Sequence, residues 1–126
     1  MDSDPILKET LDHLRYHFHP EWRDRTPFDV FTRLLAKKIR APKWKPSDHE
    51  PVKPSGVTSE RQIRSTEQLA KLVHAETQDQ PWNESGPIII AVYRSKEWLL
   101  DGATRINKWM REGNDDDHTV HVHVIE

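Results

Sequence analysis

The spacing of hydrophobic residues changes several times along the chain, and each change marks an expected element. Apolar residues three or four positions apart predict an amphipathic helix over residues 4–18. A second helix is predicted to begin at Pro27, because Thr26 can cap it and proline suits the first helical position. Residues 119–125 alternate valine with polar side chains, so we expect a strand whose two faces differ.

The middle of the chain connects these patterns. Residues 41–57 contain four prolines and few apolar side chains, which is typical of an extended connector. Residues 61–64 predict a short strand, and Ser65 with Gln68 forms a capping-box pattern that begins a helix. Two close strands and a further helix are then expected, at residues 87–93, at residues 98–100 and around Ile106. This order predicts an α+β fold.

Composition narrows the class of protein. The chain has 126 residues, 34% of them hydrophobic and 32% charged, with a net charge of -2, which fits one domain and excludes a uniformly basic coat protein. The absence of cysteine excludes disulfides, thiolate catalysis and cysteine-ligated metal. The apolar runs are too short for a membrane span, and the start of the chain lacks a signal-peptide pattern. We therefore expect a soluble, cytoplasmic protein with no membrane partner.

The most informative segment is residues 101–105, Asp-Gly-Ala-Thr-Arg, here called the 101–105 turn. It follows a predicted strand and begins a predicted helix, where backbone N–H groups and the helix dipole favour an anion. The candidate phosphate-binding residues are Gly102, Ala103, Thr104, Arg105 and Lys108. The alternative is an ordinary turn, in which Asp101 caps the helix and Arg105 pairs with a surface carboxylate.

The order of elements from residue 65 to residue 125 resembles the ParB/sulfiredoxin-like fold, specifically the N-terminal domain of ParB-type proteins. The matching stretches are residues 87–90, residues 100–105 and residues 120–125. The resemblance implies a mixed sheet with helices, the ParB/sulfiredoxin-like domain covering residues 58–126. Residues 1–57 would then be a two-helix N-terminal extension with its proline-rich connector.

The resemblance also implies roles for the turn. Gly102 would let the backbone approach a phosphate, Thr104 and the following N–H groups would donate to it, and Arg105 would bind it bidentately. Asp101 would cap the helix or orient a metal-bound water, so that Asp101 and Arg105 are the catalytic candidates of a hydrolytic member. The implied ligands are a nucleotide, such as ATP or CTP with Mg²⁺, or a nucleic acid.

Two departures limit the resemblance. Sulfiredoxins carry a catalytic cysteine where this chain has Ala103, which excludes sulfinic acid reductase activity. Chromosome-partitioning ParB proteins carry Gly-Glu-Arg-Arg at this turn and a downstream helix-turn-helix domain, so a CTP-gated DNA clamp is not expected. We therefore expect a divergent member that acts in DNA transactions of a bacterium, plasmid or phage, with nuclease activity as its hydrolytic form. The alternative is a non-catalytic inhibitor, antitoxin or immunity protein that binds a protein partner through the N-terminal helices.

A basic run gives a second candidate surface. Its residues are Lys37, Lys38, Arg40, Lys43, Trp44 and Lys45. Such a run can follow a phosphate backbone while its tryptophan stacks on a base. The alternative is a solvated helix end whose cations complement the helix dipole.

Histidines are the remaining candidates for chemistry. His13 and His17 are four residues apart, and His121 and His123 share one face of the last predicted strand after an acidic loop at residues 115–117. Either set has spacing that a metal ion could use. Solvated polar faces explain both patterns better, so we predict no metal site.

Overall fold

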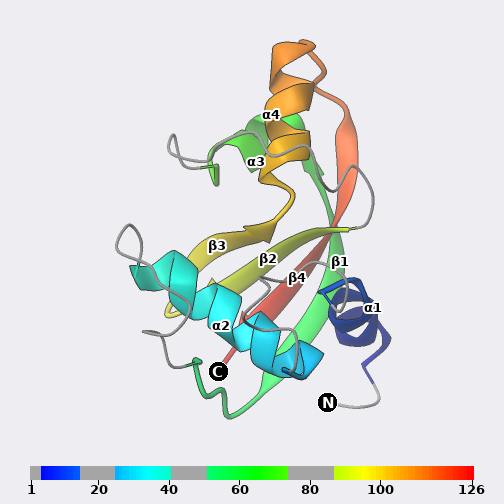
Figure 1. Cartoon of the computed structure of the whole chain (residues 1–126). Helices are drawn as coiled ribbons and strands as arrows, with labels where there is room; N and C mark the ends of the chain where they lie inside the picture. The colour runs from blue at the N-terminus through cyan, green and yellow to red at the C-terminus, as the bar shows by residue number, and fades with distance from the viewer. Residues whose placement is uncertain (1–3, 15–24, 41–50, 74–86) are drawn as a thin grey trace.

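The computed structural model describes residues 4–14, 25–40, 51–73 and 87–126. Their elements, in chain order, are α1 (Pro5–Leu14), α2 (Pro27–Arg40), β1 (Val57–Ser65), α3 (Thr66–Ala70), β2 (Ile88–Tyr93), β3 (Lys96–Asp101), α4 (Ala103–Arg111) and β4 (Asp117–Ile125). The strands form one sheet in the order β1-β4-β2-β3 (Figure 1). The two central strands, β2 and β4, are parallel, and the two outer pairs are antiparallel. The predicted α+β class with a mixed sheet is confirmed.

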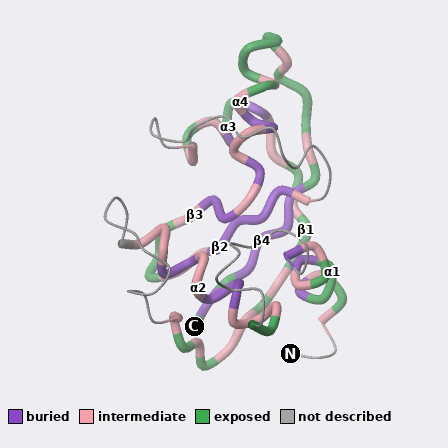
Figure 2. Tube along the Cα trace, viewed as in Figure 1, coloured by how far each residue is buried: buried purple, intermediate pink, exposed green. Residues whose placement is uncertain are grey.

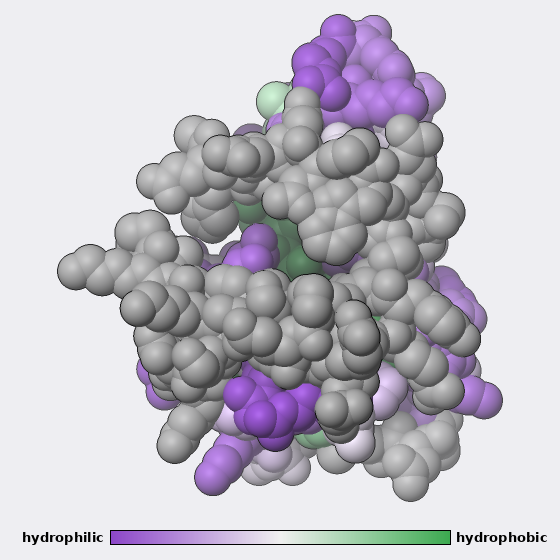
Figure 3. All heavy atoms as spheres, viewed as in Figure 1, coloured by the Kyte–Doolittle hydropathy of each residue, from purple (hydrophilic) through white to green (hydrophobic). Residues whose placement is uncertain are grey.

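Strand β4 explains how the sheet is covered. Val120 and Val122 belong to the core under α3 and α4, whereas Ile125 belongs to the core under α1 and α2. The strand is buried along most of its length (Figure 2). Each face of the sheet therefore packs against its own pair of helices. The described surface seen from the side of α2 is mostly hydrophilic, and its hydrophobic atoms show mainly near the centre (Figure 3).

Helices α1 and α2 share a core with the sheet. Its buried members are Leu14, Val30, Phe31, Leu35, Ile89, Ala91, Leu100 and Ile125. Asp4 caps α1 by accepting from the backbone N–H groups of Ile6 and Leu7. Thr26 caps α2 as predicted, because its hydroxyl accepts from the N–H of Asp29 at 3.2 Å. The apolar stripes of the two helices are thus used inside the fold rather than left for a partner.

Helices α3 and α4 cover the other face with an almost purely aliphatic core. Its buried members are Leu69, Ile88, Ile90, Leu99, Ile106, Val120 and Val122. The predicted capping box is confirmed, with Ser65 accepting from the N–H of Gln68 and the Gln68 side chain accepting from the N–H of Ser65. Near the beginning of β4, the ring of His118 stacks on the ring of Trp109, with the ring centroids 3.7 Å apart.

The largest difference from the predicted elements is β1. The sequence indicated a short strand at residues 61–64, but the strand covers Val57–Ser65 and pairs with β4 throughout. Its polar composition hid it, because an edge strand with exposed side chains needs little apolar alternation. Residues 15–18 of the first predicted helix and residues 41–50 of the connector lie outside the described residues. Among the described helices, none is long and apolar enough to cross a membrane.

Candidate functional site

The 101–105 turn lies where β3 ends and α4 begins, and its glycine is required by packing. Gly102 has φ 116°, in the left-handed region that favours glycine, and a Cβ there would lie 2.4 Å from Cδ1 of Ile88. Gly102 itself is the N-cap of α4, with no side-chain capping bond. The expectation that Asp101 caps this helix is therefore wrong, and its carboxylate is engaged elsewhere.

The Asp101 carboxylate binds a histidine from the first helix. Nε2 of His13 lies 2.7 Å from Oδ2 of Asp101, and NH2 of Arg105 lies 3.8 Å from the same oxygen. The side chain of His13 is only 10% exposed. The sequence predicted a polar helix face at His13, but α1 packs on the sheet with His13 turned toward the end of β3, so the ring is buried.

Arg105 is buried rather than placed on the surface. It is 8% exposed, and its NH2 group donates to the backbone carbonyl of Pro87 at 3.0 Å. Burial lowers the pKa of Arg105, while the negative charge of Asp101 opposes that shift. The alternative predicted that Arg105 pairs with a carboxylate on the surface. Arg105 does lie near a carboxylate, that of Asp101, but its side chain is buried.

One cation of the predicted basic run interacts with the same carboxylate. Burial lowers the pKa of Lys38, the charge of Lys37 lowers it further, and Asp101 raises it. Burial also lowers the pKa of Lys37. The electrostatic link to the turn is thus made by Lys38. The side chain of Arg40 and residues 43–45, which include Trp44, lie outside the described residues.

The remaining residues of the predicted phosphate site lie on the first two turns of α4. Ala103 and Thr104 are half-buried, and Lys108 is exposed. The turn therefore combines a helix N-terminus with Lys38, Arg105 and the His13–Asp101 pair, contributed by β3 and three helices.

Beside the turn, two buried histidines form a polar network beneath α1. His121 is 5% exposed and His123 is 0% exposed, so the expectation of a solvated strand face is wrong. Nδ1 of His123 lies 2.6 Å from the Ser59 hydroxyl, and its Nε2 lies 2.8 Å from the Thr10 hydroxyl. That same hydroxyl lies 3.2 Å from Nδ1 of His121. Burial is the main cause that lowers the pKa of both rings, for His123 to about 4.

The donors and acceptors of this network can be ordered from one end. Nε2 of His121 lies 3.4 Å from a carboxylate oxygen of Glu9, so Nε2 of a neutral ring must carry the hydrogen. Nδ1 of His121 then accepts from Thr10, which in turn accepts from Nε2 of His123. Ser59 donates to the remaining nitrogen of His123. We assign both rings as neutral Nε2–H tautomers on this consistency.

The acidic loop does not join the histidines. Residues 115–117 are exposed at the beginning of β4, while His121 and His123 lie further along that strand. No group of three or more metal-ligating side chains is assembled within the described segments. Asp115 instead accepts from the backbone N–H of Glu67.

Thr10 was not predicted as a site residue, and His13 was considered only as a metal ligand. The signal for Thr10 was present, because it lies on the buried face of α1 between Leu7 and Leu14. His13 had no such signal, since its partner is 88 positions away in the chain. Comparison with protein-family models, curated proteins and solved structures finds no match for this chain. The case for a ligand therefore rests on the geometry of the turn.

Proposed function

We propose that the protein binds the phosphate of a nucleotide or nucleic acid at the 101–105 turn, in the manner of a divergent ParB-like domain acting on DNA. The observation that carries this proposal is the position of Arg105, whose NH2 group lies 3.8 Å from the Asp101 carboxylate at a helix N-terminus. Lys38 from α2 interacts electrostatically with the same carboxylate. An anion placed there meets a guanidinium, an ammonium and the positive end of the helix dipole.

The electrostatics favour a ligand of negative charge. Burial lowers the pKa of both Lys38 and Arg105, which means that their charged forms are less stable here than in water. A bound phosphate would compensate for the lost hydration through charge-assisted hydrogen bonds. Burial of these two cations therefore favours a phosphate ligand over an ordinary turn.

The His13–Asp101 pair gives the hydrolytic form of this function a general base. A carboxylate 2.7 Å from an imidazole nitrogen holds the ring in one orientation. In a nuclease or nucleotide hydrolase, His13 would accept a proton from the attacking water and Asp101 would orient His13. In this proposal His13, rather than Asp101, is the group that acts on water.

Binding can be tested by isothermal titration of the full chain. The ligands are ATP, CTP, GTP and short single- and double-stranded oligonucleotides, each with and without Mg²⁺. We expect Lys38→Gln to weaken binding by roughly tenfold or more, the usual effect of losing a charge-assisted contact. Lys71→Gln is the matched control, because it removes the same charge from an exposed residue, the C-cap of α3. The proposal fails if no ligand binds, or if the two variants bind equally well.

Catalysis needs a separate measurement. Turnover of any ligand that binds is followed for the unmodified chain and for His13→Gln. We expect the variant to retain binding and lose most of its turnover. Turnover unchanged in His13→Gln would exclude His13 as the base while leaving the phosphate site intact. The inhibitor or antitoxin alternative stays a prediction. A protein partner would have to bind α1 and α2 through their polar faces, because the apolar faces of these helices pack in the core.

A further inference from the structure

Strand β1 is an edge of the sheet and carries an exposed apolar side chain on one face. It covers Val57–Ser65 and pairs on one side with β4; among the described segments, no strand pairs with its other side. Ile63 in its second half is 71% exposed. Long, exposed edge strands offer unpaired backbone groups to another strand, and natural proteins usually protect them.

The other edge, β3, shows such protection. It has six residues, its pairing with β2 contains a register shift next to Ile89, and α2 packs against it. It follows a two-residue hairpin turn, in which Arg94 and Ser95 adopt positive φ. Strand β1 is longer, and its nine residues pair with β4 without a register shift, although α1 and α3 contact it.

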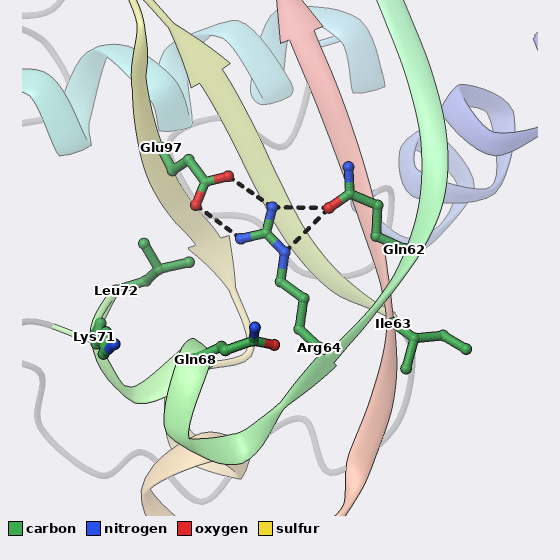
Figure 4. A pocket seen from close by; sticks show the side chains of 7 residues that line it. All are labelled: Gln62, Ile63, Arg64, Gln68, Lys71, Leu72 and Glu97. Carbon is green, nitrogen blue, oxygen red and sulfur yellow. Dashed lines mark hydrogen bonds and ion pairs between the residues drawn. The ribbon is translucent and has the colours of Figure 1, made fainter.

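The polar side chains of β1 follow an order that matches a second copy of the same strand. On the face toward α3, Gln62 donates to Glu60 at 2.5 Å. Arg64 donates to Gln62 at 2.9 Å (Figure 4). The row therefore runs from acid through amide to base. Read in the opposite direction, as an antiparallel copy would present it, the same row runs from base to acid.

We propose that β1 pairs antiparallel with β1 of a second copy of this chain, with the two-fold axis at Gln62, so that the sheet continues through a symmetric dimer. Glu60 then faces Arg64 of the second copy, and Gln62 faces its own equivalent. On the other face of the sheet, the exposed Ile63 is covered by the stem of Arg61 of the second copy.

Neighbouring registers fit less well. A two-fold axis perpendicular to the sheet keeps each face continuous, so only residues of the same face can oppose one another. An axis at Arg61 would place two guanidinium groups opposite each other, which is destabilising. An axis at Ile63 would pair only residues 61–65 and leave Glu60 outside the strand pairing. The axis at Gln62 pairs residues 59–65 and matches opposite charges.

Arg64 can take part in this pairing without leaving its present partners. It binds Glu97 through NH1 and NH2, at 2.8 and 2.6 Å, across a groove of about 430 Å³ (Figure 4). Gln62 accepts from Nε and NH2, so one NH1 donor of the five stays available for a second carboxylate. The interface is small, so we expect the dimer to dissociate on dilution.

Sedimentation velocity of the full chain over a wide concentration range tests the association. We expect a monomer–dimer equilibrium for the unmodified protein and a monomer throughout for Glu60→Lys, which places a lysine opposite Arg64. Glu112→Lys is the control, because it makes the same charge change at an exposed position after α4. A protein that stays monomeric at the highest concentration, or that loses dimer equally in both variants, overturns the proposal.

Disulfide trapping tests the register, since the chain has no cysteine of its own. Residues opposite each other in an antiparallel pair have Cα atoms about 4.5–5.5 Å apart, within the range a disulfide spans. We expect Gln62→Cys to cross-link rapidly between chains under mild oxidation. Thr58→Cys is the control, because position 58 lies far from its own equivalent in this register. Equal rates for the two variants, or faster cross-linking of Thr58→Cys, would exclude it.

Discussion

The two faces of the sheet are stabilised by different chemistry, although the same strand supplies both. Toward α3 and α4, β4 contributes Val120 and Val122 to an aliphatic core. Toward α1 and α2, it contributes His121 and His123 to a network of imidazoles and hydroxyls. Aliphatic packing is non-directional and independent of pH, whereas the network requires neutral rings and particular donors. The docking of α1 is therefore the directional, pH-sensitive part of the fold.

The largest expected effect is on the aliphatic face. Ile90 is fully buried on β2, so Ile90→Ala leaves a cavity and we expect it to lower the free energy of unfolding by about 3–4 kcal/mol. Urea denaturation at pH 7 and at pH 5 measures this loss. Because no titrating group is removed, the loss should be the same at both values. A loss that changes strongly with pH would break the distinction between the two faces.

The next effect is the pH dependence of the network face. His123 has a pKa of about 4 in the folded protein, against an ordinary value of 6.5 that the unfolded chain regains. The unfolded chain thus binds the proton first as the pH falls. The stabilisation present above pH 6.5 is lost between about 6.5 and about 4, by on the order of 3 kcal/mol.

The variant that checks this assignment is His123→Gln, which cannot titrate. Its free energy of unfolding, measured by denaturation from pH 7 to pH 4, should lose much of the slope seen in the unmodified protein. His121 has a pKa shifted in the same direction and should contribute the remaining part of the slope. An unchanged slope in His123→Gln would show that the network does not depend on this ring being neutral.

The sequence predicted the elements better than it predicted what lies between them. The caps at Thr26 and Ser65 are local patterns, and both are present in the structure. The burial of His121 and His123 could not be read locally, because alternating valine and histidine fits a solvated face and a buried network equally well. The hydroxyls of Thr10 and Ser59, both distant in the chain, distinguish the two.

The candidate site also contains a part that the sequence predicts locally and a part that depends on tertiary packing. The 101–105 turn was predicted from one short segment, because strand, glycine and helix follow each other directly. His13 and Lys38 come from helices whose place on the sheet is decided by packing over distant residues. Such tertiary placement leaves no periodic signal in the segments themselves.

A smaller effect is expected at the hydroxyl shared by both rings. Thr10→Val keeps the shape of the buried side chain but removes the partner of His121 Nδ1 and His123 Nε2, and we expect a loss of about 2 kcal/mol. Hydrogen exchange should show the amides of α1 opening first. Thr10→Ser keeps the hydroxyl and should lose distinctly less. Equal losses in the two variants would mean that the methyl group, not the hydroxyl, holds α1.

The smallest effect tests a polar contact on the otherwise aliphatic face. Arg64 and Glu97 link the two edge strands there, and the hydrogen bond from Arg64 lowers the pKa of Glu97. Because Glu97 is partly solvated, we expect Glu97→Gln to lower the free energy of unfolding at pH 7 by roughly 0.5–1 kcal/mol. This contribution exists above the ordinary Glu97 pKa of 4.5 and is lost as the pH falls through the lowered value, so the two proteins should converge in stronger acid.

The control for this contact is Glu67→Gln, at an exposed position on α3, which should be nearly neutral. Denaturation of both variants at pH 7 and pH 3 separates the ion pair from a general charge effect. A loss in Glu97→Gln as large as that in Thr10→Val would show that the face under α3 and α4 also depends on directional contacts. The contrast between the faces would then be one of degree, because both would rely on a polar link placed over an apolar core.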